Sequence, residues 1–119
     1  MRRVLVILTG LLILSGLMLA GVPLTAQDAK MADAGKKLFT SKDCIKCHMI
    51  AGKGNKIGKL DGIASKIDVE TMKQWLTSPA EMKKKLEKQP KVKMSSKIKQ
   101  MALKPEDITS LLAYLSTLK

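Results

Sequence analysis

The chain has 119 residues, which is enough for one domain, and its formal net charge is +12 at pH 7. It contains two cysteines and one histidine, too few for a structural zinc site, which normally takes four protein ligands. One Trp, one Tyr and one Phe are few large side chains for a core at a size where cores are marginal.

The first residues have the pattern of an export signal. Two arginines follow the initial methionine, residues 4–20 are almost wholly apolar, and small residues lead to a cleavage point after Ala26. We therefore predict a signal peptide over 1–26 and an exported domain over 27–119. The apolar stretch is also close to the length that crosses a bilayer, so an uncleaved membrane tether through residues 4–22 stays open.

A short helix is expected over residues 32–40, after a polar lead-in. Gly35, Leu38 and Phe39 lie on one side of it. A glycine inside a helix costs about 1 kcal/mol relative to alanine. A close helix crossing would account for that cost, because no side chain would hold the partner away; an incidental glycine is the alternative.

The segment Cys44-Ile45-Lys46-Cys47-His48 is the pattern that attaches a c-type haem. Cys44 and Cys47 lie on one side of a helical turn, within reach of the two vinyl groups of one porphyrin. His48 then serves as the proximal iron ligand. A redox dithiol would need a βαβ pattern around it, and none is visible. Since the chain has one histidine, a second histidine is excluded as the other axial ligand.

The region after the motif is expected to be irregular and then helical. Four glycines between residues 52 and 62 predict a loop, in which a backbone carbonyl can orient the His48 ring. Asp68 is expected to cap the next helix, with Val69, Met72 and Leu76 as its buried stripe. Trp75 flanks this stripe and either contacts a haem propionate or belongs to the core.

Pro79 is expected to end the helix that starts at Val69, and a short helix is expected over residues 80–87. A lysine-rich segment overlaps and follows it. The lysines are Lys83, Lys84, Lys85, Lys88, Lys91, Lys93, Lys97 and Lys99. A solvated face is the simplest interpretation of such a run, and its density favours a docking role. Nucleic acid is excluded as the partner, because the segment is exported and lacks arginine and aromatic residues.

The last element is a helix that starts at Pro105, a residue favoured at the first helical position. Its apolar face consists of Ile108, Leu111, Leu112, Leu115 and Leu118. No segment of the chain shows the period-two alternation of a strand. The predicted fold class is therefore all-α.

Residues 32–118 resemble the class I cytochrome c family in its small bacterial single-haem form. The matching segments are Ala34-Gly35-Lys36-Lys37-Leu38-Phe39, Cys44 to His48, Asp107-Ile108 and Ala113-Tyr114-Leu115. The resemblance implies four to five short helices around one covalently attached haem c, with the first and last helices crossing near Gly35.

The resemblance also implies a distal methionine ligand in the C-terminal half, often after a lysine. Met94 follows Lys93 and is the predicted ligand, with Met101 as the alternative. The family's Gly-Pro-x-Leu loop is replaced here by Gly58-Lys59-Leu60. We expect the carbonyl contact to the His48 ring to survive, because it does not require proline.

The function implied by the resemblance is that of a periplasmic carrier of single electrons, with iron cycling between Fe(II) and Fe(III), and not an enzyme. Its expected partners are redox proteins with acidic docking surfaces, including a membrane respiratory complex. The alternative is a haem subunit permanently bound to a membrane oxidase or dehydrogenase. A catalytic haem would need an open sixth position and a distal acid–base group, and no second histidine exists to supply it.

Overall fold

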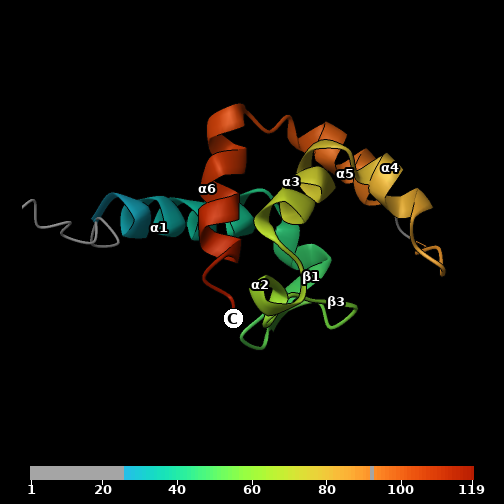
Figure 1. Ribbon diagram of the computed structural model, residues 1–119, viewed down its shortest axis with the longest axis horizontal. Helices are drawn as coiled ribbons and strands as arrows, with labels where there is room; N and C mark the ends of the chain where they lie inside the picture. The colour runs from blue at the N-terminus through green and yellow to red at the C-terminus, as the bar shows by residue number, and fades with distance from the viewer. Residues whose placement is uncertain (1–25, 92) are drawn as a thin grey trace, which may run out of the picture.

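The computed structural model describes residues 26–91 and 93–119. The helices are α1 (Ala26–Ser41), α2 (Ile63–Lys66), α3 (Val69–Thr77), α4 (Pro79–Lys84), α5 (Met94–Met101) and α6 (Pro105–Leu115), with a 3-10 turn η1 (Cys44–Lys46); the strands are β1 (His48–Ile50), β2 (Lys53–Gly54) and β3 (Gly58–Lys59) (Figure 1). The predicted export signal, or tether, falls on residues outside the described ones, apart from Ala26. Among the described residues, no helix is both long and apolar enough to cross a bilayer.

The helical fold class is confirmed, with two differences from the expectation. Helices α2 and α5 were not predicted, which brings the number in the described residues to six. A small sheet of order β2-β1-β3 is also present, in which β1 pairs antiparallel with β2 and parallel with β3. Its strands are two or three residues long, too short for alternation to appear in the sequence.

The crossing of α1 and α6 near Gly35 is confirmed (Figure 1). Gly35 is buried, and a Cβ there would lie 2.8 Å from the Cβ of Tyr114 and would overlap the carbonyl oxygen of Ser110. The absence of a side chain therefore permits the contact. Helix α1 starts six residues earlier than expected, at Ala26, because the polar lead-in contains good helix formers and no breaker.

The hydrophobic core lies where α1, β1, α3 and α6 meet. Its buried members are Phe39, Ile50, Met72, Leu76, Leu111 and Leu115. Phe39 also packs edge-on against Tyr114, with ring centroids 6.0 Å apart. The predicted apolar face of α6 is confirmed for Leu111 and Leu115, which are buried, and for Ile108 and Leu112, which pack against this cluster. Leu118 also packs against the cluster, but it lies beyond the end of the helix at Leu115.

The stripe predicted for α3 is partly wrong. Met72 and Leu76 are buried as expected, but Val69 is 50% exposed. Val69 is the first residue of the helix, and it lies in an open groove with α6 residues such as Ile108 and Leu112. The packed part of α3 therefore begins one turn later.

Two helix starts are capped by aspartates. The predicted cap of α3 is confirmed, because Asp68 Oδ1 accepts a hydrogen bond from the backbone N–H of Thr71 at 2.6 Å. Helix α6 has Lys104 in place of a Ser or Thr cap. There Asp107 Oδ2 instead accepts from the Lys104 backbone N–H at 3.0 Å, which satisfies the donor before the helix.

Candidate functional site

The Cys44–His48 motif forms one tight turn followed at once by a strand. Asp43 enters the turn in the left-handed conformation (φ 60), and the Cys47 N–H donates to the Cys44 carbonyl at 3.1 Å. Both thiols are free and half-buried. His48 is the first residue of β1, so the turn and the strand bring the two cysteines and the histidine to one place.

The environment of the thiols does not suit a redox dithiol or a zinc site. Burial raises the pKa of the Cys44 thiol, and the nearby Asp43 charge adds to the rise. A reactive dithiol needs the opposite shift, towards the thiolate. Within residues 26–91 and 93–119, no group of three or more His, Cys, Asp or Glu side chains could hold a metal ion.

The His48 ring is oriented by a backbone carbonyl. Its Nδ1 lies 3.1 Å from the carbonyl oxygen of Gly58, which the β1–β3 register places opposite His48. A carbonyl can only accept, so Nδ1 carries the proton and the Nε2 lone pair is free for a metal. Burial lowers the pKa of His48 and so favours the neutral ring. The hydrogen bond to Gly58 acts in the opposite direction and is the smaller effect.

The expected carbonyl contact is therefore present without the family's proline. Gly58 is needed for it, because a Cβ at this position would lie 2.6 Å from His48 Nδ1. A larger residue would push the ring away or pull the carbonyl out of reach.

Two polar residues of the glycine-rich loop were missed in the sequence reasoning. Asn55 Nδ2 donates to the Lys46 carbonyl at 3.1 Å, and its Oδ1 accepts from the Ile57 N–H at 3.0 Å. Asp61 Oδ1 accepts from the Ala51 N–H at 2.8 Å. Asn and Asp commonly close turns in this way, so their place in the loop was the available signal.

Trp75 lies on α3, half-buried. Among the described residues it is not one of the side chains that pack against the core cluster. Met82 on α4 is buried and also lies outside that cluster. This arrangement favours the haem-edge interpretation of Trp75 over the core one, and a propionate contact stays a prediction.

The two distal-ligand candidates occupy opposite ends of α5. Met94 is its first residue, half-buried and packed against the core cluster. Met101 is its last residue, and its carbonyl accepts a hydrogen bond from Lys42 Nζ at 3.2 Å. Seven residues of helix separate them by about 10 Å, so the two sulfurs are not interchangeable without a large shift of α5.

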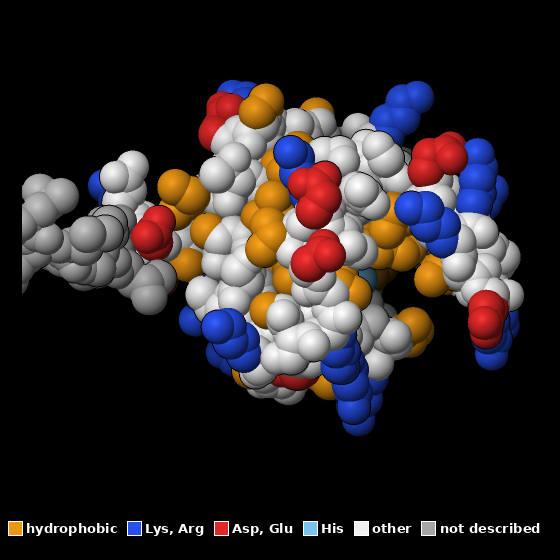
Figure 2. Space-filling view, in the orientation of Figure 1, with side chains coloured by type: hydrophobic (Ala, Val, Ile, Leu, Met, Phe, Trp, Pro, Cys, Tyr) orange, Lys and Arg blue, Asp and Glu red, His pale blue; other side chains and the backbone are white. Residues whose placement is uncertain are grey.

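The surface around the histidine is hollowed and apolar. Figure 2 shows the pale-blue histidine in a notch with hydrophobic side chains on both sides. Two thiols in one turn, an imidazole with a free Nε2, and an apolar notch fit a covalently attached haem.

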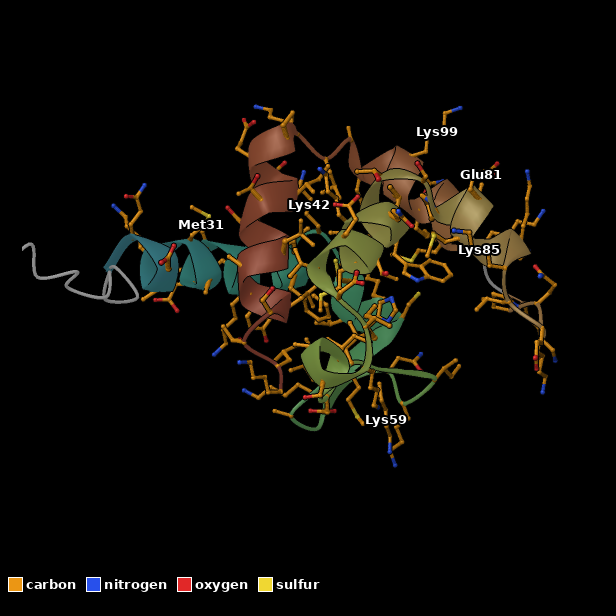
Figure 3. The ribbon with its side chains drawn as sticks, viewed as in Figure 1. Met31, Lys42, Lys59, Glu81, Lys85 and Lys99 are labelled. Atoms are coloured by element: carbon orange, nitrogen blue, oxygen red, sulfur yellow. The ribbon has the colours of Figure 1, made fainter. Side chains whose placement is uncertain are left out.

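The lysines of the 83–99 segment are exposed except Lys83, which is half-buried. Figure 3 shows Lys85 on the α4 side and Lys99 on α5. Lys84 pairs with Glu81 at 2.8 Å. The segment therefore presents a strongly positive face.

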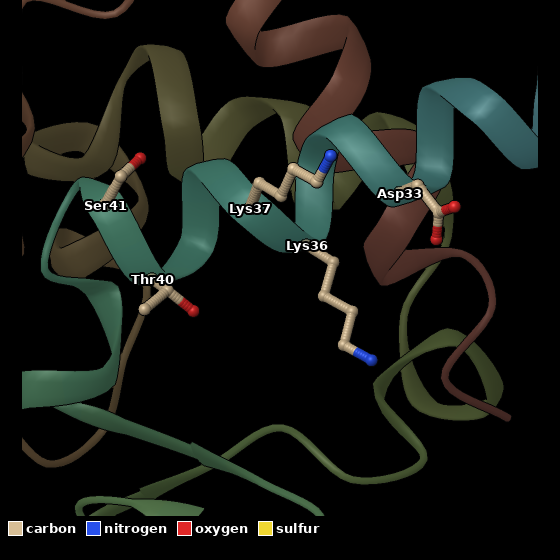
Figure 4. A pocket seen from close by; sticks show the side chains of 5 residues that line it. All are labelled: Asp33, Lys36, Lys37, Thr40 and Ser41. Atoms are coloured by element: carbon tan, nitrogen blue, oxygen red, sulfur yellow. The ribbon is translucent and has the colours of Figure 1, made fainter.

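A separate depression lies along α1 and includes no residue of the Cys44–His48 motif. It is lined by Asp33, Lys36, Lys37, Thr40 and Ser41 (Figure 4). All five side chains are exposed and all come from one helix. The depression is a polar stretch of helix surface and contains none of the predicted site residues.

Comparison with known proteins finds a family match. The family model described as Cytochrome c matches residues 32–119. No curated protein and no solved structure matches the chain. The matched region runs from α1 through the cysteine motif to the end of the chain and includes both methionine candidates.

Proposed function

The chain belongs to the cytochrome c family and carries haem c covalently, and from this we propose that it is a periplasmic one-electron carrier with His48 and Met94 as axial ligands. Haem-based electron transfer follows from the family. The observation that carries the proposal is His48, directly after the two cysteines, with its Nδ1 proton held by the Gly58 carbonyl. Its Nε2 is thereby left free and would bind the iron of the attached haem.

The residues of the chain would hold the haem and tune its reduction potential. Cys44 and Cys47 supply the thioether bonds, and the Gly58 carbonyl keeps the His48 ring in one tautomer and one orientation. When bound, the haem supplies the iron that accepts and returns one electron. A thioether from Met94 would raise the reduction potential relative to a second nitrogen ligand and would close the iron to outside ligands.

The lysine-rich segment supports docking to an acidic redox protein, which we propose to be part of a membrane respiratory complex. Met94 lies inside this segment, so the positive face borders the distal side. Long-range attraction of this kind speeds encounter and favours quick release, which suits a mobile carrier.

Spectra of the holoprotein test the axial ligands. We expect Met94→Ala to lose the methionine-to-ferric-iron charge-transfer band and to bind carbon monoxide when reduced. Met101→Ala is the matched control and should behave as wild type. An unchanged spectrum for Met94→Ala would refute the ligand, and ready carbon monoxide binding by the wild type would refute the carrier.

Salt dependence tests the docking role. The rate of electron transfer to an acidic protein acceptor should fall about tenfold between low and physiological ionic strength. Lys85→Ala/Lys88→Ala should slow the low-salt rate. Lys36→Ala/Lys37→Ala removes the same charge from exposed positions of α1 and should have a smaller effect. A rate independent of salt would remove the lysines from the mechanism.

The intact mass of the exported protein tests the periplasmic proposal. Cleavage after Ala26 would leave a chain that starts at Gln27 plus one haem. Retention of residues 1–26 would support the tethered subunit instead.

A further inference from the structure

Lys42 makes a long-range hydrogen bond that the residues around it in the sequence do not predict. It lies between α1 and the cysteine turn, is half-buried, and is labelled in Figure 3. Its Nζ donates to the Met101 carbonyl at 3.2 Å, across 59 positions of sequence. Within residues 26–91 and 93–119, this is the one hydrogen bond that joins α5 to a distant part of the chain.

The chemistry of the contact is that of a helix C-terminus. The last carbonyls of a helix have no partner within it, and a cation there both donates to them and complements the negative end of the helix dipole. Helix α5 ends at Met101, with Ala102 next in the left-handed conformation. Lys42 therefore satisfies one end of α5 from outside the helix.

The rest of α5 is held by side-chain packing against α4 and the core cluster. The residue before the helix, Lys93, provides no side-chain cap, and Met94 and Ile98 are the helix's contacts with the core cluster. An eight-residue helix is stiff over its length of about 12 Å. Fixing the carbonyl of Met101 therefore also limits where Met94 can lie.

We propose that Lys42 is a positioning residue for the distal ligand: by tying the end of α5 to the chain two residues before Cys44, it holds Met94 at a set place relative to the haem-attachment turn. The inference rests on the proposed ligation by Met94. It predicts that loss of the hydrogen bond weakens the methionine–iron bond while the fold and haem attachment are kept.

The test compares three variants of the holoprotein. Lys42→Met keeps the aliphatic stem and removes the donor, whereas Lys42→Arg keeps a donor. Lys59→Met is the matched charge control, because Lys59 is exposed on β3 and makes no side-chain hydrogen bond within the described residues. The measurements are the ferric methionine charge-transfer band, the affinity of the ferric protein for imidazole, and amide hydrogen exchange in residues 97–101.

We expect Lys42→Met to bind imidazole about tenfold more tightly than wild type, the factor that corresponds to loss of one charge-assisted hydrogen bond. Its charge-transfer band should weaken, and the α5 amides should exchange faster. Lys42→Arg and Lys59→Met should remain close to wild type. Should Lys42→Met fail to take up haem, Lys42→Leu, which also lacks a donor, serves the same comparison.

Equal behaviour of Lys42→Met and Lys59→Met, or wild-type behaviour of Lys42→Leu, would overturn the inference. The proposed function fails in a different way. If Met94→Ala loses the band while Lys42→Met keeps it, Met94 is a ligand that does not need Lys42. If the wild type has no band at all, the methionine ligation itself is wrong, and the positioning role falls with it.

Discussion

Substitution of Gly35 by alanine tests the helix crossing that organises the fold. The added methyl would lie 2.6 Å from the carbonyl carbon of Ser110 and 2.8 Å from the Cβ of Tyr114. Carbon atoms in contact are normally about 3.5–4 Å apart, so α1 and α6 must separate by about 1 Å. Phe39 and Tyr114, whose rings are 6.0 Å apart across this crossing, would lose part of their contact.

The expected change in the free energy of unfolding is the difference between two opposing effects. Overpacking of a tight site costs about 1–3 kcal/mol, and the upper end applies because the obstructing Ser110 atoms are backbone and cannot rotate away. Alanine also stabilises a helix by about 1 kcal/mol relative to glycine. The net expected loss is about 2 kcal/mol in the free energy of unfolding, or about 10 °C in Tm for a domain of this size.

Denaturant unfolding of the holoprotein, followed by far-UV circular dichroism, measures this loss. Ala34→Gly is the control, because Ala34 is the exposed neighbour in the same helix and reports the propensity effect alone. We expect both variants to be less stable than wild type. A Gly35→Ala protein about 1 kcal/mol more stable than wild type would show that propensity is the only effect and that no close approach exists.

Three further changes test the site and the local backbone. Gly58→Ala should lower the yield of holoprotein, because its Cβ would lie 2.6 Å from His48 Nδ1. Ile57→Ala, a change at the exposed neighbouring residue, should not lower it. Equal haem-to-protein ratios for Gly58→Ala and wild type would contradict the argument. Ala102→Gly should raise the free energy of unfolding by about 0.5–1 kcal/mol, since Ala102 has a positive φ of 47 that glycine adopts without strain. The hydrogen bonds from Thr71 lower the pKa of Asp68, so its stabilising effect is present above the ordinary aspartate range and is lost as pH falls through the lowered pKa. The stability difference between wild type and Asp68→Ala should therefore shrink in acid, and a difference that grew there would contradict this sign.

The features that the sequence predicted correctly are those with a local physical signature. Gly35 stands in a helix where glycine is unfavourable, so a close crossing was a reasonable inference. Asp68 has the residue type of a cap in front of a helical pattern. A carbonyl contact to the His48 ring was expected from the glycine-rich loop, and the family resemblance pointed to the stretch that begins at Gly58.

The features that were missed depend on contacts between distant residues or on very short elements. Helix α5 carries Met94 and Ile98 on one side, but the dense lysines obscured that pattern. Strands β2 and β3 have two residues each and no side-chain signature. The contact of Lys42 with Met101 spans 59 positions, and no local rule reaches so far.

The distribution of buried residues leads to a prediction about local stability. The core cluster joins α1, β1, α3 and α6 through protein contacts alone. Helix α4 contributes Met82, which is buried outside that cluster. Helix α5 reaches the cluster through partly buried side chains, and its end is also held by the hydrogen bond from Lys42. Opening of α5 should therefore require less free energy than opening of α1 or α6.

Native-state hydrogen exchange on the holoprotein should accordingly show the slowest amides in α1 and α6 and faster ones in α5. This order would mean that the segment with the docking lysines and the proposed distal ligand can adjust to a partner without disturbing the helix crossing. Equal protection of α5 and α6 would instead mean that the haem and its distal ligand bind α5 as firmly as the core binds α6, and the protein would then behave as one cooperative unit.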